Sequence, residues 1–159
     1  MAELAHRIDA RRDAPTYDQD WAAWAGHQVE MLKQRRFDEV DVESLWDEVE
    51  SLAKRDFKAW VSALRLVLMH MLKWDYQPGH RARSWIITIG RERHEIEDGL
   101  ETSPSYAART EEAVTKAYSR ARRDAGDETG LPSETFPETC PYDWTAITTR
   151  EHSLPGDEG

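Results

Sequence analysis

Residues 42–74 read VESLWDEVESLAKRDFKAWVSALRLVLMHMLKW, and this stretch decides the fold. Its apolar residues recur every three or four positions without a glycine or proline, which is the spacing of one helix face. Asp41 supplies a capping oxygen just before it, and Pro78 and Gly79 end it. At about 1.5 Å per residue this helix would run for about 50 Å. Between residues 57 and 74 it is apolar almost all round, so we expect a central helix contacted on several sides.

Three further helices are predicted from the same periodicity. They cover about residues 18–36, 84–100 and 105–125, and the first begins at a capping oxygen from Thr16 or Asp18. We expect the large aromatic residues on their apolar stripes to cover a core, and an exposed one to mark an interface. The residues expected to face inward are Trp21, Trp24, Ala25, Gln28 and Leu32 on the first helix, with Trp46, Trp60, Trp74 and Trp85 among the other tryptophans.

The last part of the chain, from Ser133 to Gly159, has no sustained period, and its prolines exclude a long helix. Four of its side chains are too apolar for a free tail and should hold an extended segment against the helices: Phe136, Tyr142, Trp144 and Ile147. The fold class is therefore all-α, a helical bundle of about four helices with a long central helix and an extended, proline-rich C-terminal segment. We expect one domain over 16–150 between flexible ends at 1–15 and 151–159.

The charge of the chain narrows the classes of partner. It has 159 residues, with 31 acidic and 21 basic side chains and a formal net charge of -10. The acids gather in residues 38–50 and again after residue 126. Nucleic acids and anionic membranes both attract cationic surfaces, so we expect neither as a partner. Without an apolar run for a signal peptide or membrane span, and with the single Cys140, a cytoplasmic protein is expected.

Three ordered blocks of sequence resemble one known family. The middle block is His70 to Pro78 (HMLKWDYQP), followed by Arg81, Arg83, Ser84, Trp85, Thr88, Ile89 and Arg93. The first block comprises Tyr17, Asp18, Asp20, Trp24, Arg36, Phe37, Asp38, Glu39, Asp41, Glu48 and Glu50, and the last comprises Glu128 to Pro132, Phe136, Pro137 and Cys140 to Tyr142. Together they resemble the bacterial family known as domain of unknown function 29 over residues 17 to about 147. The resemblance implies a small helical bacterial protein and brings no established activity, substrate or cofactor.

The candidate site lies at the end of the central helix and in the turn after it. A half-buried imidazole near cations would stay neutral at pH 7, ready to accept a proton or bind a metal ion. The arginines at 81, 83, 91 and 93 could instead hold a phosphate or carboxylate with Lys73. The alternatives are side chains that only tie the helices together, and arginines that pair with the acids of 38–50. The candidate residues are His70, Lys73, Gln77, Arg81, Arg83, Ser84 and Trp85.

Two His-x-x-Glu pairs have the spacing that metal sites in helical bundles use: His27 with Glu30 and His94 with Glu97. They are weak candidates, because His94 shares a polar face with Arg91, and chains this rich in charge produce such pairs readily. No glycine-rich phosphate loop, nucleophile elbow or zinc-protease motif is present, so the sequence predicts no cofactor.

These observations favour a non-enzymatic protein-interaction or regulatory domain that acts through a protein partner or by self-association. A small-ligand, anion-binding protein or an enzyme with its site around His70, Arg81 and Arg83 is the alternative. A metal-binding helical bundle is the second alternative.

Overall fold

The computed structural model describes residues 14–155, and within this range the chain forms helices, turns and loops without a β-strand. Residues 1–13 and 156–159, which belong to the terminal segments expected to be flexible, lie outside the described residues. The chain divides into two compact units: an N-terminal unit that ends at Lys54 and a C-terminal unit that begins at Arg55. The all-α prediction is confirmed.

The N-terminal unit contains α2 (Trp21–Lys33), the 3-10 turn η1 (Phe37–Glu39) and the first turns of α3 (Val42–Tyr76). Asp20 caps α2, since its Oδ1 accepts a hydrogen bond from the Ala23 amide at 2.9 Å. The predicted caps were wrong because the Thr16 carbonyl instead closes the turn before the helix, accepting from the Gln19 amide. The helix also ends three residues earlier than predicted, where Arg35 adopts the left-handed conformation (φ 59) that terminates helices.

Asp41 joins the two helices of this unit and is the predicted cap of α3. Its Oδ1 accepts from the Ser44 amide at 3.2 Å, and its Oδ2 accepts from Trp24 Nε1 at 3.1 Å. Its own amide donates to Gln28 Oε1 at 2.8 Å. The hydrogen bond to Ser44 is the main cause that holds the pKa of Asp41 below its usual range. One carboxylate therefore starts α3 and fixes α2 beside it.

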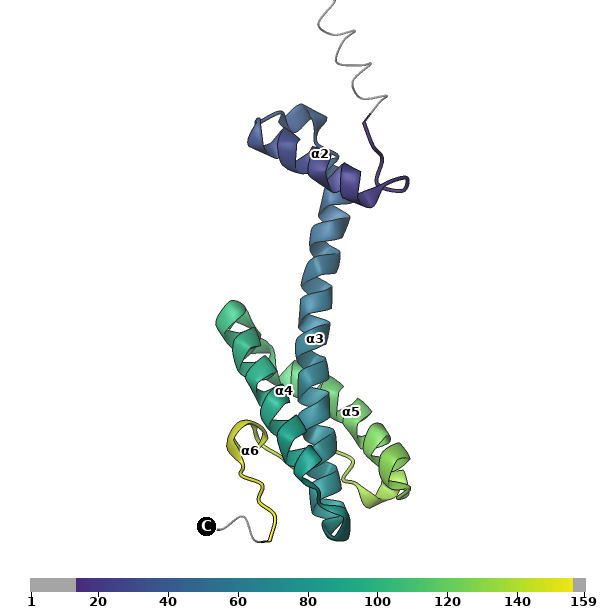
Figure 1. Cartoon of the computed structure of the whole chain (residues 1–159), viewed down its shortest axis with the longest axis vertical. Helices are drawn as coiled ribbons and strands as arrows, with labels where there is room; N and C mark the ends of the chain where they lie inside the picture. Colours follow the sequence, from purple (N-terminus) through teal and green to yellow (C-terminus); the bar gives the residue numbers. More distant parts are fainter. Residues whose placement is uncertain (1–13, 156–159) are drawn as a thin grey trace, which may run out of the picture. The chain divides into compact units, whose positions relative to one another are not determined.

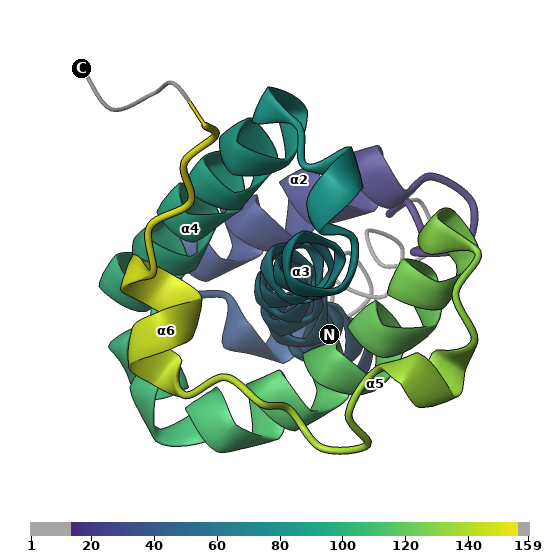
Figure 2. The ribbon, with the colours of Figure 1, turned by 90° about the horizontal axis from the view of Figure 1, so that it is seen from below.

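In the C-terminal unit, α4 (Arg83–Thr102) and α5 (Thr110–Thr129) lie on either side of α3, which Figure 2 shows end-on between them (Figures 1 and 2). From Phe57 onward α3 is largely buried, which confirms the predicted central helix. Four alanines of α5 have no exposed surface, so this helix approaches α3 through small side chains. Those alanines are Ala113, Ala117, Ala121 and Ala125.

Helix α5 begins later than the predicted fourth helix, because residues 104–109 form the 3-10 helix η3 (Pro104–Arg109). The end of α5 is a glycine C-cap: Gly130 has φ 71, and its amide donates to the Gly126 carbonyl at 2.9 Å. Left-handed backbone at this position favours glycine, which lacks a Cβ.

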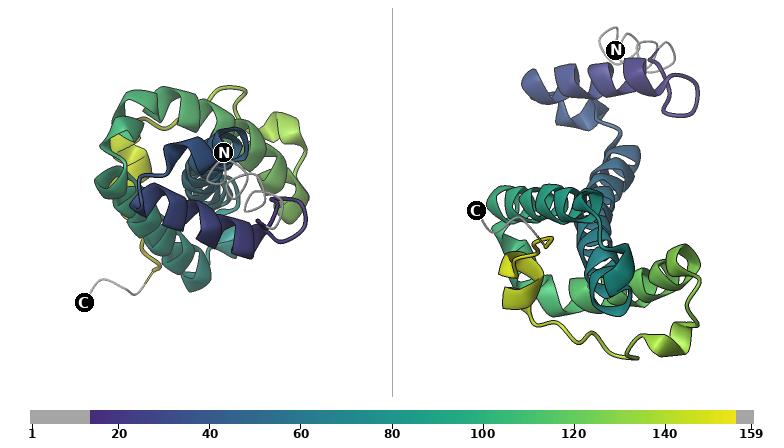
Figure 3. Two further views of the ribbon diagram at one scale, coloured as in Figure 1. Left: turned by 90° about the horizontal axis from the view of Figure 1, so that it is seen from above. Right: turned by 60° about the horizontal axis from the view of Figure 1, so that its bottom comes forward.

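After α5 the chain returns across the helices through η4 (Ser133–Thr135) and the short helix α6 (Trp144–Thr149) to α4 (Figure 3). Phe136 and Ile147 are completely buried, as predicted, while Tyr142 and Trp144 are partly buried. The phenol of Tyr118 donates to the Pro137 carbonyl at 2.6 Å. Helix α6 was not predicted, because six residues are too few to display a helical period.

Candidate functional site

His70 and Lys73 lie close together in the C-terminal unit, and both are almost completely buried. Imidazole Nδ1 is 2.9 Å from the Leu66 carbonyl oxygen of the same helix. Lys73 Nζ donates to Glu128 Oε2 at 2.5 Å and lies 4.5 Å from the ring centroid of Trp85. Burial is the main cause that lowers the pKa of His70, and the Lys73 charge lowers it further. These contacts join α3 to α4 and α5.

The other candidate residues after the end of α3 do not converge on His70. Gln77 Nε2 donates to the Thr129 carbonyl at 3.1 Å, at the end of α5. Arg81 Nε donates to the Trp74 carbonyl at 3.0 Å, and its guanidinium carbon lies 4.9 Å from the centroid of the Trp74 ring. The remaining two candidates, Arg83 and Ser84, are exposed in the first turn of α4.

Arg91 and Arg93 have different partners within the C-terminal unit. Arg91 donates through Nε and Nη2 to Glu92 Oε1, at 2.9 and 2.6 Å. Arg93 donates to the carbonyls of Ala146, Ile147 and Arg150, at 3.1, 2.7 and 2.8 Å. Arg93 therefore caps α6, and both arginines have partners other than the acids of 38–50 that the charge count suggested. The hydrogen bonds of Arg93 join α4 to α6.

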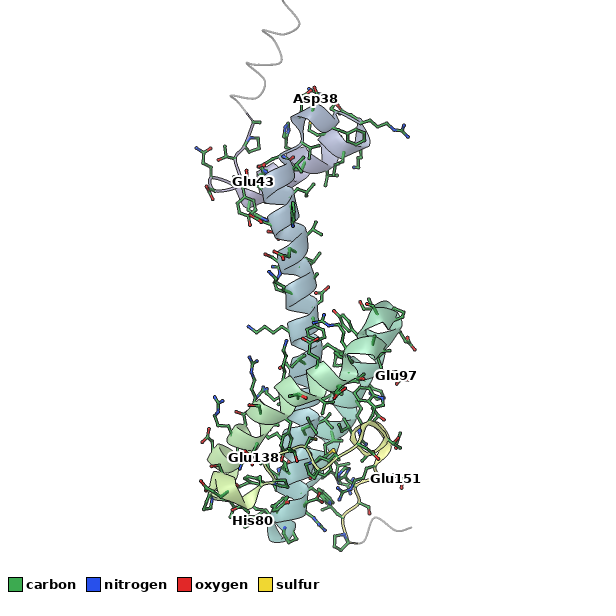
Figure 4. The ribbon with its side chains drawn as sticks, turned by 180° about the vertical axis from the view of Figure 1, so that it is seen from behind. Asp38, Glu43, His80, Glu97, Glu138 and Glu151 are labelled. Carbon is green, nitrogen blue, oxygen red and sulfur yellow. The ribbon has the colours of Figure 1, made fainter. Side chains whose placement is uncertain are left out.

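The candidate metal ligands do not converge in the described part of the chain. His27 and Glu30 lie on α2, and Glu30 accepts from Lys33 at 3.2 Å. His94 and Glu97 are exposed on α4, and Figure 4 shows Glu97 pointing outward. Among residues 14–155, no group of three or more histidine, cysteine, aspartate or glutamate side chains is placed to hold a metal ion. Separately, burial raises the pKa of the Cys140 thiol.

A cleft of about 580 Å³ lies between α3, α4 and η3 in the C-terminal unit. Trp60 and Tyr106 line it, with ring centroids 5.0 Å apart. Most of the ionisable side chains along it are carboxylates, which belong to Asp56, Glu92, Glu95 and Asp98. Arg91 is the one basic residue that lines it. The carboxylates make this cleft unfavourable for a phosphate or carboxylate ligand.

The N-terminal unit presents an apolar helix surface that the sequence did not predict to be exposed. We call it the α3 face: Val42, Leu45, Trp46, Val49, Leu52 and Ala53. Trp46 is 70% exposed, although its spacing predicted a core position. A shallow groove of about 500 Å³ runs along the face and is lined almost entirely by apolar atoms. The prediction for Trp46 was wrong because the helical period identifies an apolar face but does not supply the segment that covers it.

A second apolar stripe, which we call the α2 stripe, lies on helix α2 and comprises Trp21, Ala25, Val29 and Leu32, of which Ala25 is partly buried. Trp21 is 52% exposed and Leu32 is 40% exposed, so their predicted inward position was wrong. The buried positions of this helix lie on an adjacent face and contain Trp24, Gln28 and Met31. Large apolar side chains are therefore exposed on both helices of this unit.

Acidic side chains border one edge of the α3 face. Glu43, Asp47 and Glu50 are exposed, and by helical spacing they follow the same side of the apolar stripe. Lys54 follows that side too, and its Nζ lies 3.1 Å from Glu50 Oε2. Figure 4 shows Asp38 and Glu43 in this unit. On the other edge Glu48 Oε2 accepts from the Tyr17 phenol at 2.9 Å. The acidic block therefore does more than cap the helix, since three of its carboxylates lie beside an uncovered apolar surface.

Neither a curated protein nor a solved structure matches the chain. Within the described residues no helix combines the length and apolar character needed to cross a bilayer. The family described as "Domain of unknown function DUF29" matches residues 16–152, which is most of the chain. The chain therefore belongs to the DUF29 family.

Proposed function

We propose that this chain is a non-enzymatic protein-interaction domain that binds an amphipathic helix on the α3 face. The observation that carries the proposal is Trp46, a tryptophan with 70% of its surface exposed in the middle of an apolar stripe. Val42 and Val49 beside it are 63% and 60% exposed. Apolar surface gains about 25 cal/mol for each Å² removed from water, so a helix laid along this stripe would bind favourably.

The charge beside the face selects the kind of helix. Glu43, Asp47 and Glu50 would repel an acidic partner and attract lysine or arginine next to the apolar contact. The partner we propose is therefore a helix with an apolar stripe and at least one lysine or arginine beside that stripe. By comparison, Lys73 beside His70 already bonds to Glu128, and Arg81 bonds to the Trp74 carbonyl.

Site-specific photo-crosslinking in the native cell tests this function. A photoreactive benzophenone amino acid replaces Trp46, and a matched chain carries it at Ile87, an apolar side chain of the C-terminal unit that is 62% exposed. Position 46 should give a discrete covalent adduct, and position 87 should not. Mass spectrometry of the adduct should map the crosslink to a helix that carries lysine or arginine. Equal labelling at both positions, or a crosslinked segment without basic residues, would contradict the proposal.

A further inference from the structure

We infer that the helix bound on the α3 face is α2 of a second copy of this chain, and that the two copies bind reciprocally. Each copy contributes its α2 stripe to the α3 face of the other. The inference rests on the proposed function and names its partner. It follows from the presence, in one small unit, of two uncovered apolar stripes with different charges beside them.

The α2 stripe has the chemistry that the α3 face requires. Trp21, Val29 and Leu32 are 52%, 47% and 40% exposed and share one side of the helix. Lys33 ends α2 and Arg35 follows it, and both side chains are exposed. Lys33 is bonded to Glu30 at 3.2 Å, but with both side chains mostly exposed such a pair contributes little and exchanges readily. Helix α2 is therefore an amphipathic helix with a basic C-terminal end.

The two stripes also match in length. Trp21 and Leu32 delimit one, and Val42 and Ala53 delimit the other, so each is about 16 Å long at the helical rise of about 1.5 Å per residue. An antiparallel arrangement places Lys33 of one copy near Glu43 of the other. It also brings the positive end of the α3 dipole next to the negative end of α2.

Two other dimers can be drawn, in which each helix pairs with its own copy, and both are less favourable. An antiparallel α3–α3 pair would bring Asp47 near its own copy, and like charges across an interface are unfavourable. Pairing α2 with α2 would leave both α3 faces uncovered. The reciprocal arrangement covers all four stripes, and a two-fold axis closes it without leaving a surface for further copies.

Light scattering during size-exclusion chromatography measures the assembly directly. The intact chain at tens of micromolar should have twice its 18.4 kDa mass. Trp46→Glu and Leu32→Glu should each raise the dissociation constant by about 30-fold or more, because each places a carboxylate in an apolar contact. Ile87→Glu changes an equally exposed apolar residue of the other unit and should leave the dimer intact. Circular dichroism checks that every variant keeps its helices.

Mixing the variants tests the reciprocal geometry. The Trp46→Glu chain keeps a normal α2 stripe, and the Leu32→Glu chain keeps a normal α3 face. A mixed dimer therefore contains one intact α2–α3 contact, whereas neither variant can form one with itself. The mixture should associate at concentrations where each variant alone is monomeric. A dimer through α3 alone or α2 alone predicts no such recovery.

Charge exchange provides an independent readout. Lys33→Glu and Glu43→Lys should each weaken the dimer, and the chain that carries both should recover most of the affinity. A monomeric intact chain, or a Leu32→Glu chain that still dimerises, would overturn the inference. If the intact chain is monomeric but position 46 crosslinks to a basic helix of another protein, the proposed function stands and only the second copy is excluded. No adduct at position 46 would overturn both.

Discussion

The carboxylate of Asp75 forms a two-point ion pair with the guanidinium of Arg150. Nη1 of Arg150 lies 2.8 Å from Oδ2 of Asp75, and Nη2 lies 2.6 Å from Oδ1. The Tyr142 phenol donates to the same carboxylate at 2.8 Å. Burial raises the pKa of Asp75, but the hydrogen bonds from Arg150 and Tyr142 outweigh it and hold the pKa below its usual range. This pair fastens the C-terminal segment to the end of α3.

Replacing Arg150 with alanine removes the two hydrogen bonds that its guanidinium donates to Asp75. The expected loss is about 2 kcal/mol of unfolding free energy, typical of hydrogen bonds to a charged group and reduced here because Arg150 is partly exposed. Urea unfolding at pH 7 measures it. Arg123→Ala, at an exposed position of α5, serves as the control and should change stability by no more than about 0.5 kcal/mol. Equal losses in the two variants would show that the Asp75 pair contributes nothing specific.

Gly99 permits the close approach of α4 to α3. A Cβ added there would lie 2.4 Å from Cδ1 of Trp60, whose Nε1 donates to the Ile96 carbonyl at 3.0 Å. Gly99→Ala should therefore lower the unfolding free energy by about 1–3 kcal/mol, the usual cost of overpacking. Gly90→Ala is the matched control on the same helix, because nothing beyond the local helix backbone and its two chain neighbours lies within 4 Å of its added Cβ.

The control should have the opposite sign. With open space around it, Gly90→Ala should raise the unfolding free energy by about 0.5–1 kcal/mol through helix propensity alone. Thermal unfolding followed by circular dichroism compares the two variants. A Gly99→Ala chain that is stabilised like the control would mean that Trp60 can move away without cost.

His152 should make the protein less stable in mildly acidic solution. Its ring packs edge-on against Trp74 with centroids 5.2 Å apart, and its buried Nε2 has no hydrogen-bond partner among the described residues. Burial first, then the charges of Arg150 and Arg93, lowers the pKa of His152 to about 4. The folded state thus favours the neutral ring, so its contribution is complete above pH 6.5 and decreases as the pH falls toward 4.

The comparison of the intact chain with His152→Phe isolates this effect. Between pH 7.5 and pH 5 the unfolding free energy of the intact chain should fall by about 1–2 kcal/mol more than that of the variant. Phenylalanine keeps the ring contact with Trp74 and cannot be protonated. Parallel pH profiles of the two chains would show that His152 takes up its proton without cost in the folded state.

Glu128 should affect both the unfolding free energy of the protein, through Lys73, and the pKa of His70. Glu128→Gln leaves the buried ammonium of Lys73 without its counter-charge and should cost about 1–2 kcal/mol, less than a fully enclosed pair because Glu128 is half exposed. Lys73→Met removes the charge and keeps the apolar stem, so its cost should be smaller. NMR titration should show that Lys73→Met raises the pKa of His70 and Glu128→Gln lowers it. Shifts in the opposite directions would contradict the arrangement.

Much of the fold could be predicted from local sequence signals. The Asp41 cap, the long helix after it and the break at Pro78 follow from side-chain chemistry within a few residues, and the structure confirms all three. The predicted burial of Phe136 and Ile147 is confirmed too. It could be predicted because long apolar side chains rarely remain exposed in a segment that packs on helices. Helix ends were less accurate, because turns such as that at Arg35 depend on backbone energies that residue type reflects weakly.

The partners of polar side chains could not be predicted in the same way. Arg93 was placed in a cationic cluster by its charge and neighbours in the sequence, yet it binds the Ala146, Ile147 and Arg150 carbonyls. Backbone acceptors carry no sequence signature, because every residue has a carbonyl. Their position relative to a guanidinium depends on the path of a chain segment more than fifty residues away.

Trp46 and Trp60 show where the sequence by itself stops. They lie on the same side of α3, about four turns apart, and the helical period that predicts this needs only the residues between them. Trp60 is 3% exposed and Trp46 is 70% exposed. The sequence determined the helix and its apolar face, which are local properties. Only the tertiary structure decided which part of that face is covered, because burial requires a distant segment to pack there and a period along one helix contains no information about it.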